Sequence, residues 1–260
     1  MTWQFSNREL QRKFDLLALL THKEFALKYK RTTLGILWSL FNPLLTALVF
    51  FVAFKVFMRF KMENYTFFLL TALFPWSWFS ASVIISSRSL VDNVTLIKKM
   101  IFPRHYLIAS VILAQMVHLV FSVPILLVVA AANGSVPSPL WLIAIPIAMA
   151  VQFAFTFGLS LAIAICNTYF RDIEYLVGVF MNLLFWMTPI TYPMTAIPER
   201  YRPLALLNPL TSLMNLWRSI FIHNTIAWGD LGIASLMAAI SLTAGFMIFR
   251  RLEKRLDEVL

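Results

Sequence analysis

Aromatic side chains are concentrated in the apolar stretches of this 260-residue sequence, which holds 24 Phe and 8 Trp residues. Trp38 and Phe41 open one stretch, Phe185 and Trp186 lie in the middle of a later one, and Tyr192 closes it. An aromatic face can stack on the apolar face of a sugar ring, so a channel lined by these five residues would let a glycan slide. Aromatic residues also form belts at membrane interfaces and face lipid. The residues alone leave both interpretations open.

The basic segment from Arg88 to Arg104 is a candidate docking surface. Asp92 or Asn93 can cap a short helix that ends at Lys98-Lys99, where basic residues favour a helix C-terminus. A short helix with an apolar and a basic face suits docking into a groove of another protein. Asp92, Lys98, Lys99 and Arg104 are therefore candidate coupling residues. The alternative is that the basic residues only fix the orientation of the neighbouring membrane spans.

A third candidate is the segment 194–229, which is apolar but interrupted. Asn208-Pro209 opens a helical pattern that runs to about Ile222, and the whole segment is too short for two membrane spans. We expect re-entrant or interfacial helices here, with Asn208, Pro209 and Arg218 as candidates for an outer gate. Arg218 is either a packed structural charge or a residue that faces a pore exit.

Several kinds of chemistry are missing from the sequence. All 12 acidic residues lie outside the deep parts of the apolar stretches, which argues against a carrier coupled to protons or sodium. The sequence has no Walker A, HExxH or GxSxG motif, its four histidines are scattered, and Cys166 is the sole cysteine. We therefore expect no catalytic residue, no metal site and no cofactor on this chain.

The elements that position these candidates are apolar helices. The chain is 60% hydrophobic and 13% charged, and residues 105–170 include no Asp, Glu, Lys or Arg. A bilayer can accommodate such a run, because a helix of ~20 apolar residues crosses it with its backbone satisfied. Turn-forming residues at 133–139 divide the run into two helices. The net charge of +10 does not indicate nucleic-acid binding, because the charges lie between apolar runs.

The charge-free windows predict an all-α integral membrane protein with a single transmembrane domain over residues 1–260. Residues 1–33 are predicted to form an amphipathic helix at the interface, with Leu10, Phe14, Leu17 and Leu20 at helical spacing. Segments on one side, including both termini and the loop 87–105, hold 16 basic residues against five on the other, so both termini are expected in the cytoplasm. The six predicted spans are 34–57, 66–86, 106–132, 140–166, 175–193 and 231–249.

Four motifs in this order resemble the polysaccharide-exporting ABC-2-type permeases, the membrane subunits for O-antigen, capsule and teichoic acid export. The motifs are YKRTTLGILWSLFNPL at 29–44, KKMIFPR at 98–104, NTYFRDI at 167–173 followed by TPITYP at 188–193, and LNPL at 207–210. They extend over nearly the whole chain.

The resemblance implies a homodimer with a central channel in the bacterial cytoplasmic (inner) membrane. It implies that each copy docks on a separate ATP-binding subunit, which would bind ATP and Mg²⁺, through the cytoplasmic loop and the N-terminal helix. Family substrates are glycans on undecaprenyl-diphosphate or a related lipid. In the family, aromatic residues of the first and fifth spans line the channel, and the outer loop forms short helices at its exit.

Two other classes remain as alternatives. One is an ABC-2 permease for drugs or small lipids, which would differ in its substrate. The other is a membrane scaffold without transport activity, or an intramembrane enzyme that modifies glycans; the lack of buried acidic residues speaks against the enzyme.

Overall fold

The computed structural model describes residues 2–30, 32–35, 37–59, 62–134 and 137–256, and within them it leaves the side chains of residues 2–10 and 39 undescribed. The described backbone forms helices and no strands. The helices are α1 (Thr2–Tyr29), α2 (Leu37–Phe50), the π-helix η1 (Phe51–Phe57), α3 (Tyr65–Asp92), α4 (Val94–Lys99), α5 (His105–Ala132), α6 (Trp141–Tyr169), α7 (Ile173–Met187), the 3₁₀ turns η2 (Met194–Ala196) and η3 (Glu199–Tyr201), α8 (Arg202–Leu207), α9 (Pro209–His223) and α10 (Trp228–Glu253).

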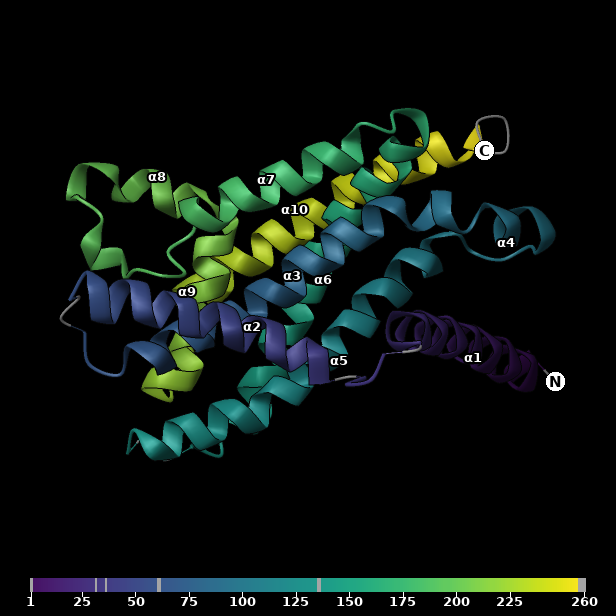
Figure 1. Ribbon diagram of the computed structural model, residues 1–260. Helices are drawn as coiled ribbons and strands as arrows, with labels where there is room; N and C mark the ends of the chain where they lie inside the picture. The colour runs from purple at the N-terminus through teal and green to yellow at the C-terminus, as the bar shows by residue number, and fades with distance from the viewer. Residues whose placement is uncertain (1, 31, 36, 60–61, 135–136, 257–260) are drawn as a thin grey trace.

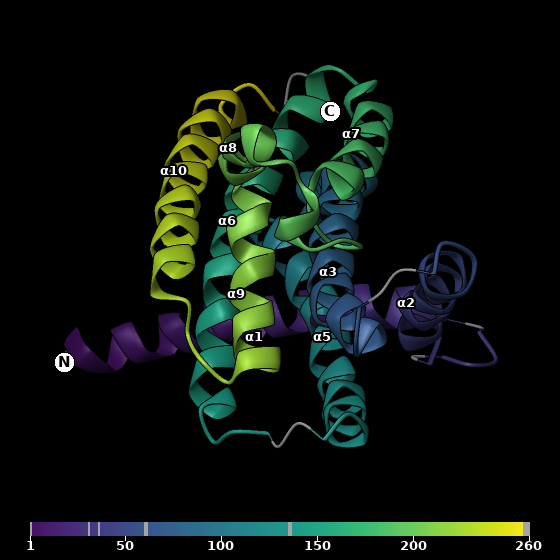
Figure 2. The ribbon, with the colours of Figure 1, turned by 90° about the vertical axis from the view of Figure 1, so that its left-hand side faces the viewer.

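The long helices run roughly side by side between two ends of the molecule. Figure 1 shows α4, the start of α1 and the end of α10 at the right-hand end, and α8 and the turn between α5 and α6 at the left-hand end. Figure 2 shows α2 standing apart from the main bundle, while α1 runs across it. The two candidate functional segments predicted from the sequence, the α4 region and the α8–α9 region, therefore lie at opposite ends.

Within the described residues, five helices are long and apolar enough to cross a membrane. They are Leu40–Phe57, Tyr65–Asp92, His105–Ala132, Trp141–Tyr169 and Trp228–Glu253. The remaining predicted span, 175–193, is represented by the shorter apolar helix α7 of 15 residues. α7 ends at Met187 because Thr188 precedes Pro189, and the residue before a proline is driven to the extended region, here φ −96° and ψ 134°. Helix α7 therefore ends six residues before the predicted C-terminal boundary of the span at 193.

The tightest contact in the bundle is the crossing of α6 and α10. A Cβ atom placed on Gly158 would lie 2.3 Å from the backbone carbon of Ser241, and one on Gly245 would lie 2.0 Å from the backbone oxygen of Gly158. Only glycine permits this approach, and small residues are the usual means by which membrane helices pack closely. The Ser241 hydroxyl donates to the Phe155 carbonyl at 2.9 Å across the same crossing.

Helix α9 lies inside the bundle, packed against α3, α6 and α10. Its start is as expected: Asn208 is the N-cap, its side chain accepts a hydrogen bond from the Leu210 amide, and Pro209 takes the first helical position. The fully buried Gln152 of α6 accepts from the Trp217 indole at 2.7 Å and donates to the Pro75 carbonyl of α3 at 2.8 Å. These bonds join three helices through one side chain.

Helix α1 packs on α5, and its burial follows the predicted apolar spacing only in part. Leu20 is buried and Leu17 is half-buried, but Phe14 is exposed. The Leu10 side chain lies outside the described part of the chain. Phe14 therefore does not belong to the face that α1 turns toward the bundle.

Candidate functional site

Four of the five predicted channel aromatics lie on α2 and α7, and the C-terminal parts of these two helices meet. Phe50 of α2 stacks on Phe185 of α7 at 5.5 Å between ring centroids, and Trp186 meets Phe50 edge-on at 6.1 Å. Trp76 of α3 contacts Phe185 at 5.7 Å. The structure thus brings Phe185 and Trp186 together with Phe50 and Trp76, two residues that sequence reasoning did not select as channel-lining.

Trp38 and Phe41 form a separate pair near the start of α2, with ring centroids 6.3 Å apart. Both are about half exposed, as is Trp186. The Tyr192 hydroxyl donates to the Trp186 carbonyl at 2.8 Å, which ties the segment after α7 back to its last turn. The five predicted aromatics therefore form two groups rather than one continuous stripe, and a channel-lining role for them stays a prediction.

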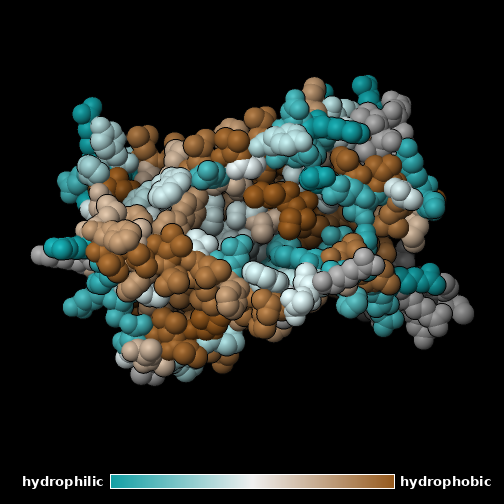
Figure 3. Space-filling model, in the orientation of Figure 1, coloured by the Kyte–Doolittle hydropathy of each residue, from teal (hydrophilic) through white to brown (hydrophobic). Residues whose placement is uncertain are grey.

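Helices α2 and α7 expose most of their apolar side chains. Figure 3 shows hydrophobic surface over α2 and the neighbouring end of α5, with hydrophilic residues gathered toward the ends of the molecule. A large apolar surface on a membrane helix faces lipid or a second protein. The exposed residues are Leu37, Trp38, Phe41, Leu45, Leu48 and Val49 on α2, and Leu176, Val179, Phe180, Leu183, Trp186 and Met187 on α7.

The predicted short helix in the basic segment is present as α4, with Lys98 and Lys99 in its last turn. Asn93 is its N-cap residue, but neither Asn93 nor Asp92 makes the predicted side-chain cap. The side-chain amide of Asn93 instead donates to the Ser89 carbonyl, and its side-chain oxygen accepts from Lys23 of α1 at 2.5 Å. Arg104 donates to the Glu253 carbonyl at the end of α10. An open hollow of about 360 Å³ lies beside α4 and is bordered by the fully exposed Ile101.

Arg88 links the C-terminal part of α3 to α7, a contact that sequence reasoning missed. Its guanidinium lies 3.7 Å from the Asp92 carboxylate, one turn ahead on α3, and 3.3 Å from the Glu174 carboxylate in the first turn of α7. This bridge could not be predicted from the sequence, because Arg88 and Glu174 are 86 positions apart and no local pattern pairs them. The C-terminal part of α3, which directly precedes α4, is therefore joined to the start of α7 by a polar contact.

Arg218 is packed rather than exposed. Its guanidinium donates to the carbonyls of Pro189 and Ile190 and lies 3.7 Å from the centroid of the Phe68 ring. Asn208 donates to the Thr188 hydroxyl at 2.9 Å. Both side chains thus hold the turn that follows α7, and the geometry favours the structural alternative for Arg218. An outer-gate role for Asn208, Pro209 and Arg218 stays a prediction.

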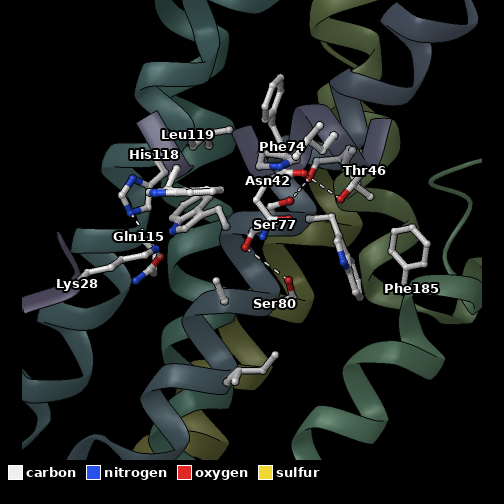
Figure 4. Close-up of a pocket in the computed structure, with 18 of the residues that line it drawn as sticks. Lys28, Asn42, Thr46, Phe74, Ser77, Ser80, Gln115, His118, Leu119 and Phe185 are labelled. Carbon is white, nitrogen blue, oxygen red and sulfur yellow. Dashed lines mark hydrogen bonds between the residues drawn. The ribbon is translucent and has the colours of Figure 1, made fainter. Parts of the chain in front are cut away.

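A cavity of about 660 Å³ is lined by α1, α2, α3, α5 and Phe185 of α7. Figure 4 shows Lys28, Gln115 and His118 grouped on one side of it, and Phe185 on the opposite side. The Lys28 ammonium donates to the Gln115 side-chain oxygen at 2.7 Å and to His118 Nε2 at 3.1 Å, and the Tyr29 hydroxyl lies 3.0 Å from the same nitrogen.

His118 is therefore a hydrogen-bonded residue in an apolar helix. Its partners could not be predicted from the sequence, because Lys28 lies 90 positions earlier in a segment with many basic residues. Throughout the described ranges, no group of three or more His, Cys, Asp or Glu side chains is arranged to hold a metal ion.

The five helices that are long and apolar enough to cross a membrane define a polytopic helical membrane protein. The chain belongs to the ABC-2 type transporter family, whose model matches residues 15–222. It is 37% identical to the O-antigen export system permease protein RfbA of Klebsiella pneumoniae over 95% of each chain, and 34% identical to the RfbA protein of Myxococcus xanthus over 84% of this chain and 85% of that one. The polysialic acid transport protein KpsM of Escherichia coli is 22% identical over 89% of this chain and 91% of its own.

Proposed function

We propose that this chain is the membrane-spanning subunit of an ATP-driven transporter that exports a polysaccharide across the bacterial inner membrane. The observation that carries the proposal is the similarity to O-antigen export permeases, at 37% identity over nearly the full length of both chains. The match to a polysialic acid transport protein supports the same class of cargo. A glycan carried on undecaprenyl-diphosphate is the substrate that we infer.

In this proposal α7 is the fifth of six spans. It is short because residues 188–193 fold back into the bundle instead of continuing the helix. Both termini lie in the cytoplasm, as the excess of basic residues in their segments favours. α1 lies at the cytoplasmic interface, and α8 and α9 form the re-entrant outer segment. The placement of both chain ends at one end of the bundle supports an even number of spans (Figure 1).

The transport channel forms between two copies of the chain. The exposed apolar faces of α2 and α7 support this arrangement, because few residues of the first span are buried within a single chain. Trp38, Phe41, Phe185, Trp186 and Tyr192 would then border the path of the glycan, where aromatic rings offer sugar-stacking surfaces without a tight site.

A separate subunit binds and hydrolyses ATP, since this sequence has no Walker A motif. That subunit docks at α4 and the hollow beside Ile101, with Asp92, Lys98, Lys99 and Arg104 as coupling residues. The Arg88 bridge to Glu174 then carries the movement of the docked subunit to α7.

Deletion of the gene tests the cargo, and substitutions in the restored gene test the residues. We expect lipid-linked glycan to accumulate inside the deletion strain and to be exported again with the parent gene; export that continues without this gene would contradict the proposal. Trp186→Ala should slow export at an unchanged amount of folded protein. Trp228→Ala serves as the control, because Trp228 of α10 is also exposed, at 72% against 53% for Trp186.

The coupling residues are tested in the purified complex. Replacing Lys98, Lys99 and Arg104 by Glu should uncouple ATP hydrolysis from export or prevent assembly with the ATP-binding subunit. Purified chain alone should hydrolyse no ATP until that subunit is added. Normal assembly and normal export in the triple variant would remove α4 from the mechanism.

A further inference from the structure

The 660 Å³ cavity has an apolar body and a single polar end. Its size falls within the ~300–1,000 Å³ range of ligand pockets. Trp38, Phe74 and Trp76 line the body, with Asn42, Thr46 and Ser77 as small polar groups between them. Lys28 is the one cation among the lining residues, and none of the lining residues is acidic. A ligand that matches this cavity has an apolar body and an anionic head.

Lys28 supplies the positive charge at the polar end of the cavity. Its ammonium has three donors, and Gln115 and His118 accept from two of them. Across the part of the chain that the structure describes, no carboxylate forms an ion pair with it. The side chain stays exposed along the cavity, but its head lies among Gln115, His118 and Tyr29, and this desolvation lowers the pKa of Lys28 to about 8. The ammonium is therefore still mostly charged at pH 7.

The balance of charge identifies the head group. A phosphodiester carries one negative charge and accepts several hydrogen bonds, which matches one ammonium beside the amide and hydroxyl donors of Gln115 and Tyr29. A diphosphate brings more negative charge than the single cation can neutralise. The ethanolamine of a zwitterionic lipid would place a second cation beside Lys28, where the cavity offers no carboxylate to receive it.

We propose that this cavity binds one anionic phospholipid of the phosphatidylglycerol type, with its phosphate at Lys28 and an acyl chain along the tryptophans of α2 and α3. The lipid comes from the membrane that surrounds the spans, and it is a bound partner rather than the cargo. It would join α1 to α2, α3 and α5 at a place where few direct contacts connect α2 to the bundle (Figure 2).

The proposal is tested by lipid titration of the full-length protein in detergent. Dioleoyl-phosphatidylglycerol should bind and raise the midpoint of thermal unfolding, with bound lipid counted by native mass spectrometry. Lys28→Met should weaken this binding about 10- to 100-fold, the factor expected for a lost charge-assisted hydrogen bond. Lys30→Met removes the same charge two residues away, outside the cavity, and should bind as the parent does.

Two further arms keep the test decisive. Ala81→Phe fills the cavity without a change in charge and should also reduce binding, which covers the case that Lys28→Met fails to fold. Dioleoyl-phosphatidylethanolamine and inorganic phosphate should shift the midpoint of thermal unfolding little or not at all. The proposal is overturned if inorganic phosphate matches the lipid, if a polyprenyl diphosphate displaces it at lower concentration, or if Lys30→Met loses as much affinity as Lys28→Met.

Discussion

The glycine crossing of α6 and α10 makes a quantitative prediction for Gly245→Ala. The new methyl group would lie 2.0 Å from the Gly158 carbonyl oxygen, where ordinary contacts begin at 3.4 Å, so the helices must separate by about 1.4 Å. The opposing atoms belong to the backbone and cannot rotate away. A gap of ~0.5–1 Å already forfeits a quarter to a half of the dispersion energy of each contact. Helices α6 and α10 would thus lose much of the contact between them.

The size of the effect follows from two opposing terms. Overpacking of this kind costs about 3 kcal/mol, at the upper end of its usual range because no side chain can yield. Alanine regains about 1 kcal/mol of helix propensity over glycine. The net loss of about 2 kcal/mol lowers the unfolding midpoint by roughly 4–8 °C for a chain of this size.

Cys166 provides the assay, because it is half-buried in α6 and is the chain's sole cysteine. A maleimide dye that fluoresces on reaction will report its exposure during heating in detergent. Gly232→Ala is the matched control, since it lies on the same helix and its added methyl meets nothing within 4 Å. It should leave the midpoint unchanged or raise it. If Gly245→Ala unfolds at the same temperature as Gly232→Ala, the close packing of α6 on α10 is refuted.

Three further predictions use the same assay. Gln152→Leu should cost about 3 kcal/mol, because the Trp217 indole and the Pro75 carbonyl lose a buried partner; a midpoint equal to the parent's would contradict the bridge. Arg218→Met should cost about 2–3 kcal/mol, and Arg218→Lys should recover less than half, since an ammonium lacks the fork that reaches two carbonyls; full recovery by lysine would rule out the two-carbonyl geometry. In lipid-free detergent, the free energy of unfolding should rise between about pH 8 and 10.5, because Lys28 keeps its proton in the unfolded chain and has released it in the folded chain. Lys28→Met should flatten this rise, and an unchanged slope would exclude Lys28 as its source.

The apolar helices could be predicted from the sequence because membrane burial acts on every residue of a span. A charge-free run of sufficient length has no stable alternative to a helix in hydrocarbon, so α5 and α6 appear within a few residues of their predicted bounds. Local chemistry also predicted the start of α9, because Asn208 and Pro209 act on their immediate neighbours. α7 ended earlier than predicted, because hydropathy does not register that Pro189 has no amide hydrogen to continue the ladder.

The polar contacts between helices were beyond prediction, since their signal lies in pairs of residues rather than in segments. Arg88 and Glu174 are ordinary charges at helix ends until α3 and α7 are placed side by side. Gln152 looked like a tolerated polar residue in a span, although a buried amide in hydrocarbon requires partners at both ends, and Trp217 and Pro75 supply them. Lys28 also has hydrogen-bond partners from other segments, but unlike Gln152 it carries a charge. Within the described residues its neutral partners satisfy hydrogen bonds and leave the charge uncompensated, which is the reason we propose an anionic lipid as the remaining partner.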